Sequence, residues 1–207
     1  MNEGAGAVVF WILVPLFVAV GLYLIWYSRR RKKMLEAFSQ THRLRIRPEH
    51  EKELQKTLDS CFSLKDENLV RSFGQLSSLV DGESIWLFRT VELLDLNPHA
   101  QSYSTHFPRI VALFDISKDH DEFFVLDKSM QASQMLPRSN SPNPHVTELA
   151  KRIAASCKAR HPLSVTLTGG HGLIYFEPLV TGGETISDVN SLYCIAKNMC
   201  EKLSEDV

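Results

Sequence analysis

Residues 69–94 read LVRSFGQLSSLVDGESIWLFRTVELL, and this stretch sets the fold class. Asp81-Gly82 divides it into two apolar arms, and Asp-Gly is a favoured pair for a two-residue turn between antiparallel strands. In the second arm apolar residues occupy both faces of the strand, which is typical of a strand covered on both sides. The stretch therefore predicts a β-hairpin within a packed sheet domain.

Further segments carry strand patterns on the C-terminal side of this hairpin. Residues 109–116 and Glu122–Leu126 predict two strands that are joined by an acidic turn. Leu163–Thr168 and residues 173–179 predict a second hairpin around the Gly-Gly-His-Gly sequence at 169–172. Strands that come in neighbouring pairs favour a largely antiparallel sheet.

About three helices are expected to accompany the sheet. Apolar residues recur at helical spacing in 48–62, in 144–158 and in a last segment for which Ser187 or Asp188 is the expected N-cap. This arrangement favours an α+β fold with the helices on one face of the sheet. Residues 129–144 are rich in proline and serine and predict a long exposed loop.

An uncharged apolar run precedes this domain. Residues 5–27 read AGAVVFWILVPLFVAVGLYLIWY, which is 23 residues of which 20 are hydrophobic. As a helix the run would be about 34 Å long, enough for a hydrocarbon core of about 30 Å. Five bases follow it: Arg29, Arg30, Arg31, Lys32 and Lys33. The positive-inside rule then places the N-terminus outside and the domain in the cytoplasm, and the bases also attract anionic lipid. A cleaved signal peptide would carry its bases before a shorter apolar core, so an uncleaved single-pass anchor is expected.

The predicted organisation has four parts. They are a short extracytoplasmic N-terminus at 1–4, a transmembrane helix at 5–27, a basic juxtamembrane connection at 28–47 and a cytoplasmic α+β domain at 48–207. The whole chain has 23 bases and 24 acids, and this balance argues against nucleic acid as a partner. From Met34 onward 18 bases face 23 acids, so the domain is mildly acidic.

No motif assigns a catalytic residue, and no metal or cofactor is expected. His171 and Glu177, on the second hairpin, form a candidate ligand site because the neighbouring glycines could bring backbone N–H groups close to an anion. A tight turn explains the same glycines equally well. The four cysteines, Cys61, Cys157, Cys194 and Cys200, contain no CxxC pair, and in a reducing cytoplasm they predict small core residues rather than a disulfide or a metal site.

The anchor with its bases at 29–33, the hairpin around 82–88 and the closing hairpin and helix at 163–203 form a recognisable layout. It resembles a family of uncharacterised bacterial single-pass inner-membrane proteins. The resemblance implies an inner-membrane location and a cytoplasmic α+β domain, and it brings no assigned activity.

Two functions remain open at this point. The first is a membrane-tethered interaction or assembly domain, whose protein partner docks on the sheet or on the 129–144 loop. The second is a membrane-associated enzyme or small-ligand-binding domain that uses the glycine-flanked hairpin around His171. The missing catalytic motifs favour the first, and the sequence does not identify the partner or the oligomeric state.

Overall fold

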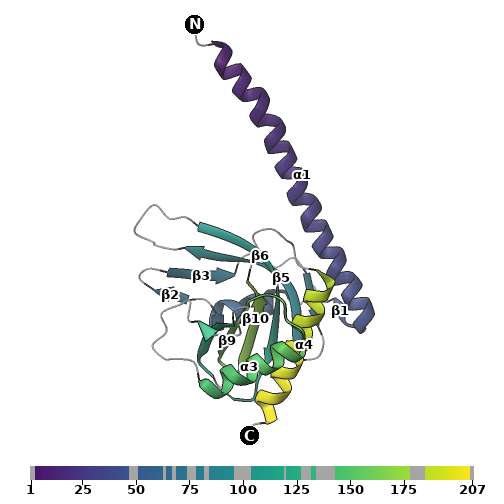
Figure 1. Ribbon diagram of the computed structural model, residues 1–207, viewed down its shortest axis with the longest axis vertical. Helices are drawn as coiled ribbons and strands as arrows, with labels where there is room; N and C mark the ends of the chain where they lie inside the picture. Colours follow the sequence, from purple (N-terminus) through teal and green to yellow (C-terminus); the bar gives the residue numbers. More distant parts are fainter. Residues whose placement is uncertain are drawn as a thin grey trace.

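The computed structural model shows a sheet domain from which a long N-terminal helix projects (Figure 1). The described residues are 3–46, 51–62, 64–66, 69–73, 78–81, 84–95, 104–118, 120–126, 132–133, 143–177 and 185–205. The Gly82 position of the first turn and most of the 129–144 loop lie outside them. The predicted α+β class is confirmed, because helices and an antiparallel sheet build the domain.

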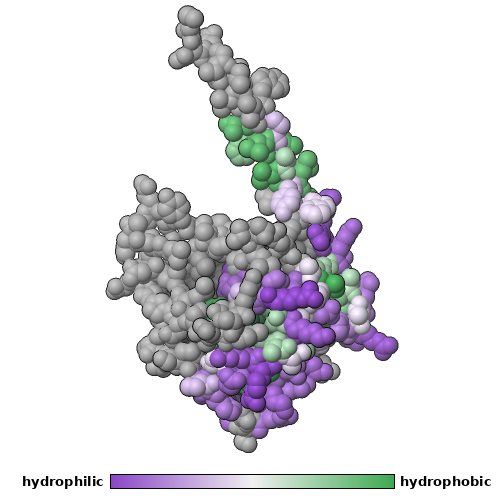
Figure 2. Space-filling model, in the orientation of Figure 1, coloured by the Kyte–Doolittle hydropathy of each residue, from purple (hydrophilic) through white to green (hydrophobic). Residues whose placement is uncertain are grey.

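Helix α1 (Glu3–His42) runs without interruption from the predicted anchor segment into the domain. Figure 2 shows hydrophobic side chains on the part of the projecting α1 nearer the domain, and Leu13 is 42% and Phe17 71% exposed. At the other end of the same helix Leu35 and Phe38 are buried in the core. The expected connection at 28–47 is therefore helical as far as His42. Among the residues that the structure describes, no helix combines the length and apolarity that crossing a membrane requires.

The C-terminal end of α1 packs against helix α4 (Ile186–Glu205). The ring of Phe38 lies 4.3 Å from the ring of His42 and 5.5 Å from the ring of Tyr193 on α4. His42 Nε2 lies 2.9 Å from the side-chain oxygen of Asn190, also on α4. The long helix is thus fixed to the domain by both apolar and polar contacts.

The described strands form one sheet in which every pairing is antiparallel. Its ten strands are β1 (Arg45–Ile46), β2 (Leu64–Asp66), β3 (Leu69–Phe73), β4 (Ser78–Asp81), β5 (Ile85–Asp95), β6 (Ser104–Asp115), β7 (Glu122–Leu126), β8 (Ala132–Ser133), β9 (Leu163–Thr168) and β10 (His171–Phe176). The order is β1-β4-β5-β6-β10-β9-β7-β8, and β3 pairs with β5 and with β2.

Both predicted hairpins are present, but the turn of the first hairpin and the neighbour of β7 in the sheet differ from expectation. Asp81 of β4 pairs with Trp86 of β5, so Asp81 belongs to the strand and the predicted two-residue Asp81-Gly82 turn is wrong. Register follows burial of the strand faces, and Leu87 and Phe88 of β5 are both fully buried. The successive strands β6 and β7 do not pair, because the β9–β10 hairpin lies between them.

Helices cover both faces of the sheet, which corrects the predicted one-face arrangement. Alternate residues of β6 point to opposite faces. Ile110, Ala112 and Phe114 join the core cluster that contains helix α3 (Pro144–Ser156) and α4. Val111 and Leu113 join a second cluster under helix α2 (Glu51–Thr57) and the π-helical turn η2 (Leu58–Phe62). Burial on both sides explains why this strand is continuously apolar.

A capping box fixes the start of α4. Asp188 Oδ2 accepts a hydrogen bond from the Thr185 N–H at 2.7 Å, and Thr185 Oγ1 accepts one from the Asp188 N–H at 3.3 Å. Thr185 is therefore the N-cap, two residues before Ser187 and three before Asp188, the predicted caps, because the acid serves as the third helical residue that bonds back to the cap.

Candidate functional site

His171 begins β10 directly after a two-residue turn formed by Gly169 and Gly170. Thr168 pairs with His171 across the hairpin, and the two glycines have φ angles of 58° and 76°. A type I′ turn needs positive φ at both central positions, which explains the glycine pair. The Gly170 carbonyl also accepts a hydrogen bond from the Ile116 N–H at 2.9 Å, so the turn is attached to the end of β6.

The His171 side chain is held by Asp115 of the neighbouring strand. The two residues are register partners on β10 and β6, and His171 Nδ1 lies 2.9 Å from Asp115 Oδ1. Their side chains are 30% and 47% exposed, so the pair is open to solvent. A carboxylate at Nδ1 orients the ring and leaves Nε2 directed away from it, as in a histidine that acts as a base or ligand.

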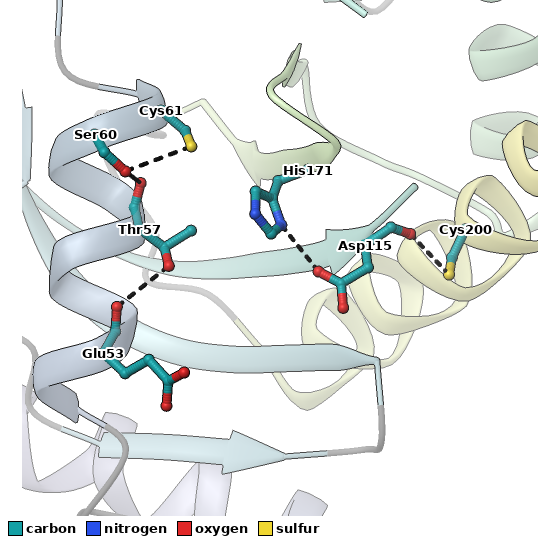
Figure 3. Close-up of polar contacts among 7 residues, drawn as sticks. All are labelled: Glu53, Thr57, Ser60, Cys61, Asp115, His171 and Cys200. Carbon is teal, nitrogen blue, oxygen red and sulfur yellow. Dashed lines mark hydrogen bonds and ion pairs between the residues drawn. The ribbon is translucent and has the colours of Figure 1, made fainter. Parts of the chain in front are cut away.

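Cys61 lies on the opposite side of His171 from Asp115 (Figure 3). Its Sγ would lie 3.4 Å from a Cβ placed on Gly169, so the thiol faces the glycine turn. The neighbouring hydroxyl of Ser60 donates to a backbone carbonyl of its own helix at 3.2 Å. A thiol, an imidazole and a carboxylate are the groups of a cysteine nucleophile with its base and orienting acid.

Asp115 also connects this cluster to α4. The Cys200 thiol donates to the Asp115 backbone carbonyl at 3.2 Å. Burial raises the pKa of Cys200; the neighbouring Asp115 and Glu201 carboxylates raise it further, while a hydrogen bond with Ser84 lowers it. The raised pKa keeps Cys200 protonated and makes it a poorer nucleophile than an ordinary thiol.

Glu177, the other predicted ligand residue, lies just beyond the opposite end of β10. The buried Arg109 guanidinium lies 3.2 Å from the Glu177 carboxylate and 4.5 Å from the Tyr175 ring centroid. Strand residues advance by about 3.3 Å each, so His171 and Glu177 are about 20 Å apart along the strand. The structure therefore does not bring the two predicted residues together, because the extended strand separates them.

The five bases at 29–33 occupy consecutive backbone positions of α1. Successive helical residues are rotated by about 100° around the helix axis. The Arg30 guanidinium lies 5.5 Å from the Trp26 ring centroid, and Lys32 Nζ lies 4.0 Å from a Glu36 carboxylate oxygen.

A second histidine–carboxylate pair lies at the start of β7, three strands away from β6 in the sheet. His120 Nδ1 lies 3.4 Å from Glu122 Oε1, and the Asn143 N–H donates to the other Glu122 oxygen. Burial raises the pKa of Glu122, against the lowering effects of His120 and of the Asn143 N–H. Within the described part of the chain, no three His, Cys, Asp or Glu side chains are grouped in a way that could hold a metal ion.

The sequence did not predict the disulfide between Cys157, at the end of α3, and Cys194, on α4. Their Cα atoms are 5.8 Å apart, although 37 positions separate them in the sequence. The expectation of a free core cysteine is wrong for this pair. Each cysteine lies on one side of a predicted amphipathic helix, but no spacing motif indicates that the two helices cross at these positions.

The fold and the site together define an α+β domain that carries an exposed apolar N-terminal helix segment and a surface cluster of Cys61, His171 and Asp115. No family model matches the chain, and no curated protein and no solved structure matches it.

Proposed function

We propose that this protein is a single-pass membrane protein that presents its α+β domain at the cytoplasmic face of a bacterial inner membrane, as an interaction or assembly domain. The observation that carries the proposal is the continuity of α1, which runs from an apolar segment that is exposed from Leu13 onward to residues buried in the domain core. Large exposed apolar surfaces mark sites of contact with protein or membrane. The uncharged run at 5–27 has the length of a membrane span, and the bases at 29–33 set its orientation.

The contact between α1 and α4 supports a role in presentation. Leu35 and Phe38 are fixed in the core, so α1 cannot swing freely relative to the sheet. A rigid connection holds one face of the domain at a set angle to the membrane, which suits docking of a protein partner. The acidic balance of the domain is unfavourable for lying flat on an anionic lipid surface.

Membrane retention and orientation test this proposal. The full chain should stay in carbonate-washed membranes. A reporter that works only in the cytoplasm should be active when fused after Val207, and a reporter that works only outside the cytoplasm should be silent there. Val18→Arg with Leu22→Arg should release the chain, because arginine within a span costs about 2.5–3.5 kcal/mol. Ser187→Arg with Glu201→Arg, at exposed positions of α4, is the matched control and should remain in the membrane. A soluble wild-type chain or an extracytoplasmic reporter signal would contradict the proposal.

The partner is tested separately by purifying the full chain in mild detergent after in-cell crosslinking. We expect one stoichiometric protein partner. Loss of that partner on deletion of 129–144 would place docking on the loop, whereas its retention would place docking on the sheet. A chain that crosslinks to nothing at its natural level would contradict the interaction role.

A second candidate function is favoured by one observation, the Asp115–His171 pair with Cys61 beside it. These groups suit a small-ligand or group-transfer site that uses the Cys61 thiol. In a Cys200→Ser background, His171→Gln should slow alkylation of Cys61 several-fold, and Lys118→Gln, an exposed change just beyond β6, should not. Equal alkylation rates in the His171→Gln variant and its parent would remove this candidate.

A further inference from the structure

The Cys157–Cys194 disulfide has a chemical consequence for a domain in the cytoplasm. Disulfides persist in oxidising compartments, whereas those of cytosolic proteins are usually transient and catalytic or redox-sensing. A disulfide between α3 and α4 is then a bond that opens and closes. This conclusion rests on the proposed cytoplasmic placement of the domain.

An open groove of about 430 Å³ between α3 and α4 lies beside the disulfide, to which its lining residue Asn198 connects it. Asn198 lines the groove, and its Nδ2 lies 3.4 Å from each of the two sulfur atoms. His145, Arg152 and Lys202 also line it, and Lys202 in addition pairs with Glu205. Grooves of this size accept small ligands, and a lining that holds Arg152 and Lys202 but no acidic side chain favours a ligand with carboxylate groups.

The two cysteines differ in exposure. Cys157 is only 7% exposed, whereas Cys194 is partly exposed. An incoming thiolate therefore reaches Cys194 first, and Cys157 becomes the leaving group. The Asn198 amide donates toward Cys157 Sγ and is placed to stabilise the negative charge that develops there.

We propose that Cys157 and Cys194 form a reversible redox site for a small thiol that carries carboxylate groups. Its thiolate attacks Cys194 Sγ, the S–S bond breaks, and the electron pair leaves on Cys157, which takes up a proton. A second thiolate attacks the small-molecule sulfur of the mixed disulfide and releases Cys194, which is also protonated. Two thiols are oxidised to one small disulfide while the protein disulfide gains two electrons, and the small disulfide drives the reverse sequence.

The redox state acts next to the junction that holds α1. Cys194 directly follows Tyr193, whose ring meets the ring of Phe38 edge-on at 5.5 Å. Opening the disulfide removes the covalent link between α3 and the part of α4 that contacts α1. The site therefore couples the cellular thiol balance to the attachment between the long helix and the domain.

Thiol trapping in cells tests reversibility on the full chain. With Cys61→Ser and Cys200→Ser as background, only the pair reacts with a heavy maleimide after acid quenching. We expect a reduced pair in growing cells, oxidation after treatment with diamide, and recovery after its removal. Cys157→Ser with Cys194→Ser in the same background gives the unreactive control.

Reduction kinetics test the groove with two defined thiols, glutathione and neutral 2-mercaptoethanol. On the purified full chain, Arg152→Gln should reduce the rate advantage of glutathione about threefold, the factor for one charge at roughly 6 Å in water. Lys197→Gln, an exposed charge on α4, is the matched control. An unchanged ratio in Arg152→Gln would overturn the role of the groove.

The outcomes separate failure of this inference from failure of the proposed function. With the reporter after Val207 in the cytoplasm, a pair that is permanently oxidised or never oxidises would overturn the redox site and leave the membrane role intact. An extracytoplasmic reporter together with a permanently oxidised pair would overturn both.

Discussion

Replacing Gly172 with alanine tests the packing at the centre of the sheet. Gly172 of β10 faces Phe114 of β6 in the register, and Phe114 is fully buried. A Cβ on Gly172 would lie 2.9 Å from Phe114 Cε1 and closer still to Cζ and Cε2. Carbon atoms pack at about 3.5–4.0 Å, so the ring would have to move by about 1 Å or more.

The net cost of the Gly172→Ala change follows from two opposing terms. Overpacking a rigid core costs about 1–3 kcal/mol, and the upper half of that range applies because the Phe114 ring has no exposed side toward which to move. Alanine recovers about 0.5–1 kcal/mol of backbone entropy relative to glycine in a strand. We therefore expect a loss of about 1–2.5 kcal/mol in the free energy of unfolding.

Urea unfolding of the full chain in mild detergent, followed by tryptophan fluorescence, measures this loss. Phe114→Leu removes the outer ring atoms, so in that background Gly172→Ala should stabilise by about 0.5–1 kcal/mol, and the double-mutant cycle should show a coupling of about 2–3 kcal/mol. Gly21→Ala, whose Cβ would meet no atom within 4 Å, is the control and should leave domain stability unchanged. A Gly172→Ala loss below about 0.5 kcal/mol, or a loss that persists with Phe114→Leu, would refute the packing argument.

Three further predictions concern other parts of the domain. Replacing Cys157 and Cys194 with serine should lower the free energy of unfolding by about 3–4 kcal/mol, because the sequence separation of 37 closes a long loop; equal urea midpoints for the oxidised and the variant chain would contradict this. Phe38→Ala should cost about 3–5 kcal/mol in the same assay, because the side chain is fully buried, and an unchanged midpoint would show that α1 is not part of the core. Burial raises the folded-state pKa of Glu122, so its stability contribution relative to Glu122→Gln is present below the unfolded-state pKa and lost as the pH rises through the folded-state pKa. Urea midpoints at acidic and neutral pH should show this loss, and a wild-type advantage that grows as the pH rises would contradict it.

Local patterns predict the existence of the elements well, because each pattern reflects a periodicity within one segment. The β9–β10 hairpin follows from its glycine pair, whose positive φ angles only a short list of residues adopts readily. The position of the turn after Asp81 cannot be predicted in this way, because the register of β4 and β5 depends on which faces of β5 are buried by distant segments. Likewise, the apolar face of 48–62 predicts that the helix is buried but not that it covers the second face of the sheet.

The candidate site is less predictable than the fold, because its members come from separate elements. His171 is identifiable from its glycine-rich surroundings, whereas Asp115 becomes its partner only through the pairing of β6 with β10 across 56 positions. Cys61 faces the same turn from η2, and the sequence does not predict that α2 and η2 pack on this face of the sheet. The Cys157–Cys194 disulfide depends on the crossing of two helices, and no sequence spacing encodes such a crossing.

The uninterrupted course of α1 makes its residue count a determinant of how the domain is oriented. Leu35 and Phe38 fix the helix to the core, and each residue added between the exposed apolar segment and Leu35 would rotate one relative to the other by about 100° and separate them by about 1.5 Å. One inserted residue would turn a different face of the domain toward whatever surrounds the apolar segment. Seven inserted residues would restore the original direction to within about 20°. The number of residues in this helix is therefore constrained by the direction in which the domain must face, just as the residues of the core are constrained by packing.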